Sequence, residues 1–182
     1  EAVVITNIHP EAPGVLTYDM RWLNDVTSER VSARPGQFNM LYMPGLGEVA
    51  ISVSGDTARQ GQCTHTIRDV GNVTGALARL TVGSTVGFRG PFGSAWPIEK
   101  CVGRDVVLVA GGIGMAPLRP VIYELIRRRA EFAELYLLIG ARSESDLLYC
   151  DEYSEWESSG VRVEATVDCA SAQWTGNVGV VT

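Results

Sequence analysis

The fold can be read from the stretch Asp105-Val-Val-Leu-Val-Ala-Gly-Gly-Ile-Gly-Met-Ala-Pro-Leu-Arg-Pro120. Its valine-rich apolar run, residues 106–110, predicts a strand buried on both faces of a parallel sheet. Gly111, Gly112 and Gly114 predict a sharp turn after that strand, because glycine adopts backbone conformations that other residues avoid. Met115, Ala116 and Pro117 then open a predicted helix, where the missing N–H of proline costs nothing. Together these elements predict an anion site, since free N–H groups and the helix dipole point at one spot.

The usual occupant of such a site is a dinucleotide pyrophosphate, but the glycine spacing here is G-x-G-x-x-P rather than G-x-G-x-x-G. The next predicted strand, residues 135–139, ends in Gly140-Ala141-Arg142 instead of an acidic residue. A Rossmann-type NAD site is therefore disfavoured. The alternative is a glycine turn that serves only strand–helix packing.

Composition narrows the function classes. The chain has 182 residues, 46% of them hydrophobic, and a net charge of −6, which argues against nucleic acid as a partner. No apolar run approaches the roughly 20 residues that span a bilayer, and the first residues lack the basic start of a signal peptide. The four cysteines are scattered and only two histidines are present, so we expect reduced thiols, no metal site and a cytoplasmic protein.

Residues 1–100 are predicted to form one domain, an antiparallel six-stranded β-barrel. Its turns are marked by glycine and proline, as in Arg34-Pro-Gly-Gln37, which fits a type II turn. A short helix is expected over residues 74–80, with Thr74 as its N-cap. The six predicted strands cover residues 3–8, 16–23, 38–43, 48–54, 64–70 and 85–89.

Residues 101–182 alternate between strand and helix patterns and predict a parallel α/β domain. Strands are expected at 106–110, 135–139 and 161–167, and helices at 117–130 and 146–157. Three strands and two helices make half of a domain of this type, so we expect it to be C-terminally incomplete.

Five stretches of the chain together form a recognisable pattern: residues 35–38 (PGQF), 48–54 (EVAISVS), 65–74 (HTIRDVGNVT), 110–117 (AGGIGMAP), and 140–143 with 146–149 (GARS, DLLY). In this order they resemble the ferredoxin-NADP reductase superfamily. The resemblance covers essentially the whole chain and implies a flavin domain followed by a nucleotide domain. Within the superfamily, the sequence resembles the gamma subunits of soluble nickel–iron hydrogenases (sulfhydrogenases) and the electron-transfer subunit of dihydroorotate dehydrogenase.

The resemblance implies an oxidoreductase that carries FAD and exchanges hydride or electrons between NAD(P)H and the iron–sulfur clusters of a multi-subunit redox enzyme. The expected partners are the iron–sulfur and catalytic subunits of a hydrogenase-like complex, and a [2Fe-2S] cluster is expected only in a missing C-terminal segment. The residues expected to bind cofactors are Ile51, Ser52, Val53, Ser54, His65, Thr66, Ile67, Arg68, Gly71, Val73, Thr74, Gly111, Gly112, Gly114, Met115, Ala116, Pro117, Gly140, Ala141, Arg142 and Asp168.

Ser52 is the one residue given a catalytic role, as a hydrogen-bond donor to the flavin nitrogen that receives hydride. Ser52 and Ser54 lie on alternate residues of the strand predicted over 48–54, so they share one face. The family's R-x-Y-S motif reads Val49-Ala-Ile-Ser52 here, without the arginine and the tyrosine. That departure supports an alternative function, a non-catalytic scaffold or regulatory subunit without functional flavin.

The resemblance also bears on the choice between NAD and NADP. Asp168 follows the third predicted strand, where NADP-specific members have serine and arginine, and a carboxylate there favours NAD. Arg142 could reverse the preference if it reaches the same ribose.

Overall fold

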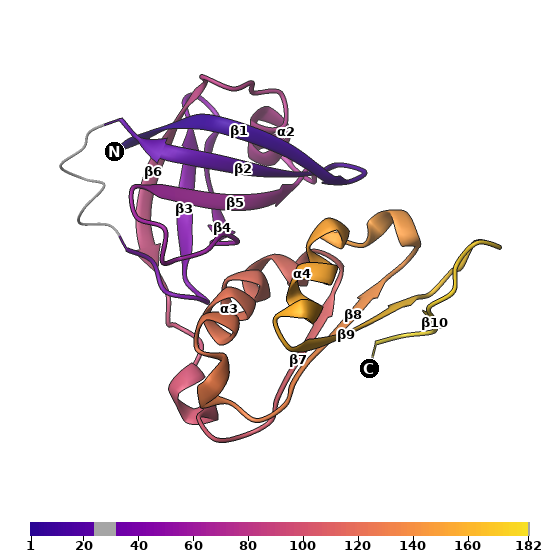
Figure 1. The fold of residues 1–182 in the computed structure, drawn as a ribbon. Coiled ribbons are helices and arrows are strands. Elements are labelled where there is room, and N and C mark those ends of the chain that lie inside the picture. The colour runs from indigo at the N-terminus through magenta and orange to yellow at the C-terminus, as the bar shows by residue number, and fades with distance from the viewer. Residues whose placement is uncertain (24–31, 182) are drawn as a thin grey trace. The chain divides into compact units, whose positions relative to one another are not determined.

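The chain divides into two compact units, residues 1–96 and 97–182, which are described separately. A computed structural model describes residues 1–23 and 32–181 (Figure 1). The domain boundary expected after residue 100 falls within a short 3₁₀ helix, η1 (Ile98–Cys101). Within the described residues, no helix has the length and apolar character needed to cross a bilayer.

The first unit is a six-stranded antiparallel sheet, which confirms the predicted strand number and direction. Its strand order is β4-β3-β6-β1-β2-β5. The edge strands β4 and β5 are not joined by a ladder of hydrogen bonds. They meet at a single bridge between Val53 and His65, next to a 2.9 Å bond from the Ser54 N–H to the Thr64 carbonyl. The strands are β1 (Ala2–Ala12), β2 (Val15–Trp22), β3 (Phe38–Met43), β4 (Gly47–Ser52), β5 (Gln62–Arg68) and β6 (Thr85–Phe92).

Alternation along β2 builds the core of this unit. Tyr18, Met20 and Trp22 are buried on one face, where they join apolar side chains of β1, β3, β5 and β6. The turn before β3 forms as predicted, because Gly36 takes φ +101° and the Gln37 N–H donates to the Arg34 carbonyl at 3.1 Å.

Two local expectations in this unit are wrong. The short helix α2 (Asn72–Leu77) begins two residues earlier than predicted, so Gly71 is its N-cap and Thr74 its third residue. The strand β4 ends at Ser52, so Ser54 does not share a strand face with it, and Ser54 is fully buried whereas Ser52 is half-buried. Both errors arise because hydroxyl side chains bond equally well at a cap, inside a first turn or in a polar interior.

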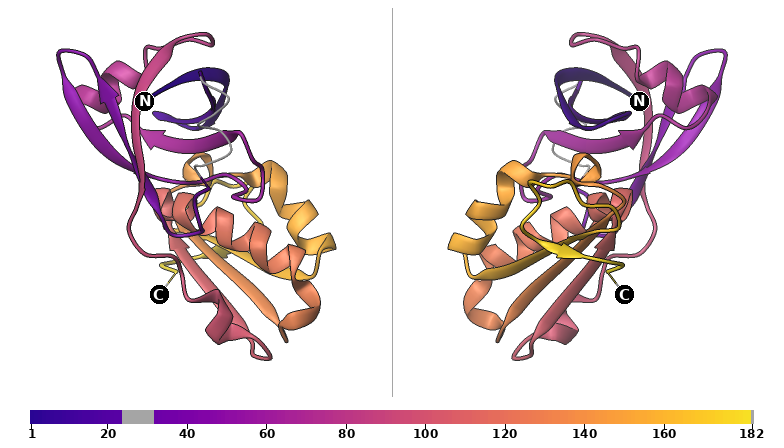
Figure 2. Two further views of the ribbon diagram at one scale, coloured as in Figure 1. Left: turned by 90° about the vertical axis from the view of Figure 1, so that its left-hand side faces the viewer. Right: turned by 90° about the vertical axis from the view of Figure 1, so that its right-hand side faces the viewer.

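The second unit is a four-stranded parallel sheet with the order β10-β9-β8-β7. Its three main strands and their parallel pairing were predicted. Successive right-handed crossovers in one direction place α3 and α4 on the same face of the sheet (Figures 1 and 2). The elements are β7 (Val106–Gly111), η2 (Gly112–Gly114), α3 (Met115–Arg127), η3 (Arg129–Glu131), β8 (Leu135–Ala141), η4 (Glu144–Asp146), η5 (Cys150–Glu152), α4 (Tyr153–Ser158), β9 (Val161–Val167) and β10 (Asn177–Val178).

Two expectations for the second unit also fail. One face of β7 is open, since Val107 and Val109 are 56% and 45% exposed, so this strand is not buried on both faces. The helix expected over residues 146–157 is interrupted at Tyr149, which takes a left-handed conformation (φ +59°, ψ +32°), and α4 begins only at Tyr153.

Candidate functional site

The glycine stretch after β7 forms an open helix start. Gly111 ends the strand in an extended conformation, and η2 runs directly into α3. The first N–H groups of this continuous helix, at residues 112–114, have no acceptor inside the helix. No acidic side chain lies in the first turn of α3 and no side chain caps it. A Cβ built on Gly111 or Gly114 would meet no atom within 4 Å, so the backbone is accessible to a ligand.

Some residues of this stretch have side chains that are not accessible to a ligand. Met115 and Ala116 are buried in the core of the second unit, and Pro117 is half-buried. Their contribution to a site is therefore the main chain and the position of the helix start.

Gly140, at the end of β8, lies beside Gly111 in the strand register. Its surroundings differ from those of Gly111, because a Cβ on Gly140 would come within 2.6 Å of the Cβ of Val181. Glycine at 140 therefore makes room for a side chain of this chain, whereas glycine at 111 leaves open space.

Charged side chains gather at the carboxyl end of β8 and β9. The N–H groups of Asp168 and Cys169 donate to the carbonyls of Ala141 and Arg142, at 3.0 and 2.9 Å, so Arg142 and Asp168 are neighbours along the edge. The exposed guanidinium of Arg142 forms an ion pair with Asp146 at 3.6 Å. Arg142 and Asp168, the two candidates for contact with a ribose, are therefore adjacent. Arg142 is already paired with the carboxylate of Asp146.

The carboxylates of Glu144 and Asp146 add negative charge to this edge, and both are held in place by hydrogen bonds. Glu144 accepts a hydrogen bond from the Ser171 N–H at 2.8 Å, and the Ser143 hydroxyl donates to Asp146 at 2.8 Å. Asp146 opens the DLLY stretch of the family resemblance, but neither Glu144 nor Asp146 was predicted to contact a ligand. The signal was present, because both follow a strand end by a few residues.

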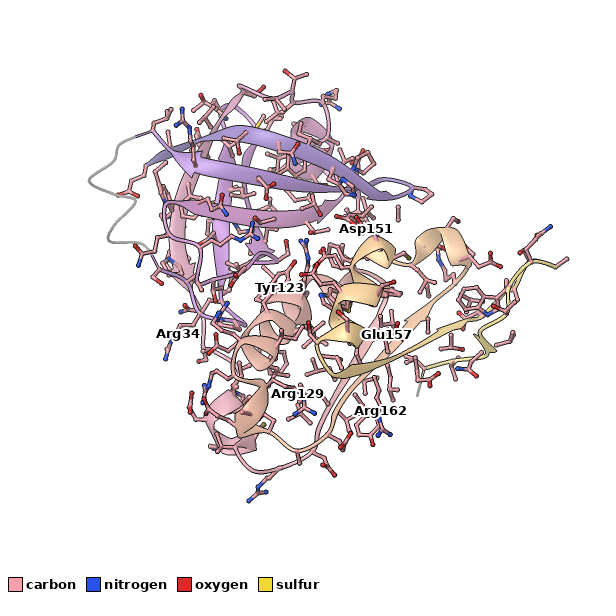
Figure 3. The ribbon with its side chains drawn as sticks, in the orientation of Figure 1. Arg34, Tyr123, Arg129, Asp151, Glu157 and Arg162 are labelled. Carbon is pink, nitrogen blue, oxygen red and sulfur yellow. The ribbon has the colours of Figure 1, made fainter. Side chains whose placement is uncertain are left out.

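A partly buried polar cluster links α3 to the segment after β8, and the sequence pattern did not reveal it. Arg119 forms an ion pair with Glu152, and its guanidinium lies over the Tyr149 ring, 4.3 Å from the centroid. Tyr123, labelled on α3 in Figure 3, donates to the same carboxylate at 2.6 Å. The cluster fixes the left-handed Tyr149 and with it the path of the chain between β8 and α4.

In the first unit, the expected cofactor contacts divide into accessible and buried residues. Ile51 and Ser52 are half-buried at the end of β4, and Arg68 is half-buried at the end of β5. The rest of the set on these two strands and just after β4 is turned inward and cannot offer side chains to a ligand in this structure. The buried residues are Val53, Ser54, His65, Thr66 and Ile67, all at most 4% exposed.

Hydrogen bonds explain why polar members of that set are buried. The Thr66 hydroxyl lies 2.8 Å from the Thr17 hydroxyl and 2.9 Å from that of Ser54, and Thr17 donates to Glu11 at 2.7 Å. His65 is fully buried, and desolvation lowers its pKa to about 4, although a hydrogen bond with the Ser52 carbonyl opposes that shift. The imidazole is therefore neutral at physiological pH.

The turn before α2 is fixed by Thr74. Its hydroxyl oxygen accepts from the N–H groups of Val70 and Gly71, at 3.1 and 2.9 Å. The N–H of Gly71, which is expected to lie near a cofactor, thus already has an acceptor within the chain. Val73, inside the first turn of α2, is half-buried.

Residues 108–182 match the family described as the oxidoreductase NAD-binding domain. The chain is 38% identical over 138 residues to the sulfhydrogenase 1 subunit gamma of Pyrococcus furiosus, covering 76% of this chain and 46% of that protein. It is 34% identical over 167 residues to a probable dihydroorotate dehydrogenase B (NAD(+)) electron transfer subunit of Methanocella arvoryzae, covering 92% and 57%. The chain thus spans about half the length of these curated relatives.

Among solved structures, the chain resembles a ferredoxin NADP+ reductase from Neisseria gonorrhoeae with bound FAD and NADP. The TM-score is 0.81 at 20% identity, and the match covers 99% of this chain and 72% of that one. At this identity the likeness establishes the fold.

Proposed function

Because the chain has the ferredoxin-NADP reductase-like fold with an oxidoreductase NAD-binding domain, we propose that it is the FAD-carrying electron-transfer part of a multi-subunit redox enzyme. Its relatives are named as a gamma subunit of a sulfhydrogenase and an electron transfer subunit of a dehydrogenase. The proposed partners are the iron–sulfur and catalytic subunits of a hydrogenase-like complex. A bound flavin would supply the redox chemistry between a reduced nicotinamide and an electron acceptor.

The observation that carries the proposal is the open helix start after β7. Accessible N–H groups at residues 112–114, together with the helix dipole, suit the pyrophosphate of NAD(P)H. The space above Gly111 and Gly114 fits this ligand, because a diphosphate must approach the main chain closely. Gly140 and Ala141 lie beside the site and shape its edge.

Gly111→Ala tests the nucleotide site. Gly111 has φ −114°, which alanine adopts freely, and the added methyl meets no protein atom, so the fold should be kept. The methyl would occupy the space proposed for the pyrophosphate. We expect NADH affinity, measured by titration calorimetry, to fall about tenfold or more, a loss of at least about 1.4 kcal/mol. Unchanged affinity would contradict the site.

Gly71→Val tests the proposed flavin site, as Gly111→Ala tests the nucleotide site. Gly71 has φ −159°, and a Cβ there meets only the Thr74 hydroxyl at 3.8 Å. We propose that Val73 and Thr74 hold the FAD pyrophosphate with main-chain N–H groups, Arg68 adds positive charge, and Ile51 and Ser52 contact the ring. We expect Gly71→Val to lose flavin but to bind NADH as before. We expect Gly111→Ala to keep flavin but to bind NADH more weakly. Loss of both ligands in both variants would indicate misfolding and not two sites.

We propose NAD in preference to NADP. The edge that would receive the adenosine ribose carries three carboxylates, Glu144, Asp146 and Asp168, and the cation Arg142 is paired with Asp146. A 2′-phosphate would be repelled there. The test is the ratio of NADH to NADPH affinity in the wild type and in Asp146→Asn, which releases Arg142. We expect the ratio to shift toward NADPH in the variant; a wild type that prefers NADPH would refute the assignment.

The alternative of a scaffold subunit has one observation in its favour. Val49 and Ile51 replace the arginine and tyrosine that the resemblance leads one to expect, and several other expected flavin contacts are buried. Visible flavin absorbance in the purified native complex, released on denaturation, distinguishes the two functions. Protein that carries no flavin, and takes up none when FAD is added, would favour the scaffold.

A further inference from the structure

His65 lies at the centre of a buried hydrogen-bonded chain that crosses three strands of the first unit. Its Nδ1 is 2.9 Å from the Ser52 carbonyl at the end of β4, and its Nε2 is 3.1 Å from Nδ2 of Asn39 on β3. The ring is fully buried, with that of Phe88 at a centroid distance of 6.3 Å. The proposed function gives this side chain no task.

The chemistry of the partners fixes the tautomer. A carbonyl oxygen can only accept, so Nδ1 of His65 must carry the proton and donate to Ser52. In the neutral ring Nε2 then offers a lone pair, which accepts from the amide of Asn39. Burial disfavours the charged ring, in agreement with this arrangement.

The side-chain amide of Asn39 is oriented so that its NH₂ group donates to His65, although its own oxygen is then left without a partner in the described part of the chain. Within the described residues, its Oδ1 is buried without a hydrogen-bond partner, a cost that calls for an explanation. A Cβ on Gly90 would lie 2.1 Å from this Oδ1, so glycine at 90 leaves the space in which the amide fits. The amide is thus held with its donor toward the imidazole.

The bond from His65 reaches the main chain where the sheet edges meet. Beyond Ser52, β4 and β5 are joined by the Val53–His65 bridge and by the bond from the Ser54 N–H to the Thr64 carbonyl. On its other edge this main chain is held by β3, since Ser52 pairs with Phe38 and the Val53 N–H donates to the Gln37 carbonyl at 3.0 Å. The imidazole adds the contact of the Ser52 carbonyl toward β5. The Ser52 hydroxyl is carried by this segment, so a shift of the main chain would move it.

We infer that His65 is a positioning residue, which, held by Asn39, fixes the main chain of Ser52 and so aims the Ser52 hydroxyl at the flavin ring. The inference rests on the proposed function for the flavin contact. The competing view is that His65 is a core residue whose replacement affects stability alone.

The tautomer can be measured without flavin. The chain has only two histidines, and the second, His9, is exposed on β1 and can be assigned with a His9→Gln variant. Nitrogen-15 NMR of the labelled protein near neutral pH should show His65 protonated at Nδ1 and unprotonated at Nε2. A proton on Nε2 instead, or an imidazolium, would overturn the inference.

Two substitutions separate positioning from packing. In His65→Asn the side-chain amide can still donate toward the Ser52 carbonyl, whereas in His65→Gln the amide reaches the Nε2 position and that bond is lost. We expect the FAD dissociation constant to rise about tenfold in His65→Gln and to stay within about threefold in His65→Asn, as for loss and retention of one buried hydrogen bond. Amide exchange at Val53 and Ser54 should quicken in the glutamine variant only.

Thr17→Val is the stability control. Thr17 is buried and hydrogen-bonded but does not touch Ser52 or Asn39, so its loss should lower stability and leave flavin affinity unchanged. Equal weakening of FAD binding and equal exchange in the two His65 variants would overturn the role of His65 alone. A wild type that takes up no flavin would overturn the proposed function and this role with it.

Discussion

The two units fill their interiors with different chemistry. Every buried asparagine, histidine, serine or threonine among the described residues lies in the first unit: Thr17, Asn39, Ser54, Thr64, His65, Thr66 and Thr74. The described interior of the second unit is built from aliphatic and aromatic side chains packed between the parallel sheet and its helices. Directional hydrogen bonds thus help to specify the antiparallel unit, whereas the parallel unit depends mainly on shape and apolar area, with the partly buried cluster of Arg119, Tyr123 and Glu152 as a polar exception. Substitutions can test this contrast.

The largest effect is expected from a cavity in the apolar interior. Leu137 is fully buried on the central strand β8, and Leu137→Ala should lower the free energy of unfolding by about 3 to 4 kcal/mol. Leu138 is half-buried on the opposite face, so Leu138→Ala should cost clearly less. Urea unfolding followed by tryptophan fluorescence measures both, and equal losses would remove the distinction between the two faces.

Acid should weaken the first unit through His65. The unfolded histidine takes up a proton near pH 6.5 and the buried one only near 4, so the unfolded state binds more protons in between. Stability therefore falls as the pH drops through this window, by at most about 3 kcal/mol, and this group adds no further loss below it. Unfolding midpoints between about pH 7 and pH 4 check this. A His65→Asn variant should show a shallower slope, and an identical slope would exclude His65 as the cause.

Removal of a threonine hydroxyl should lower the free energy of unfolding more in the first unit than in the second, by a smaller amount than the changes above. Thr17→Val removes a hydrogen-bond partner from both Glu11 and Thr66 and should cost about 1 to 2 kcal/mol. In the second unit the same change at Thr166, half-buried and bonded to the Gly179 carbonyl, should cost less than about 1 kcal/mol. Thermal unfolding of both variants gives the comparison. A larger loss at Thr166 would reverse it.

The smallest effect is expected on the outer face of the parallel sheet. Arg162, labelled in Figure 3, pairs with Glu134 at 3.2 Å, and both side chains are about half exposed or more. Arg162→Ala should change the free energy of unfolding by less than about 1 kcal/mol, because exposed ion pairs are screened by water. A loss comparable to that of Leu137→Ala would mean that polar pairs also matter to this unit.

The sequence predicted the strands and the two-part architecture because alternation and glycine turns are local signals. It predicted the open helix start after β7 for the same reason. It did not predict that Thr74 lies inside the first turn of α2, since a hydroxyl reaching back three residues uses the same donors as a cap. Nor could a strand pattern show that Ser54 lies past the end of β4.

Tertiary contacts account for the other differences. The interruption at Tyr149 depends on Arg119 and Glu152, which come from separate segments, and no local pattern encodes that meeting. The burial of His65 and Thr66 likewise depends on partners from β2 and β3, so a motif that resembles a cofactor contact can face the interior. The pairing of Arg142 with Asp146 was not foreseen, although the two residues are only four positions apart.

The open face of β7 has a consequence for the behaviour of this polypeptide in solution. β7 lies at one edge of its sheet, and Val107 and Val109 point outward from an uncharged run without proline, Val106-Val-Leu-Val-Ala110. Such an edge is a template for strands of other copies and favours cross-β stacking. Concentrated samples of this chain alone are therefore prone to aggregate through β7. A lysine at position 107 would act as a gatekeeper against it.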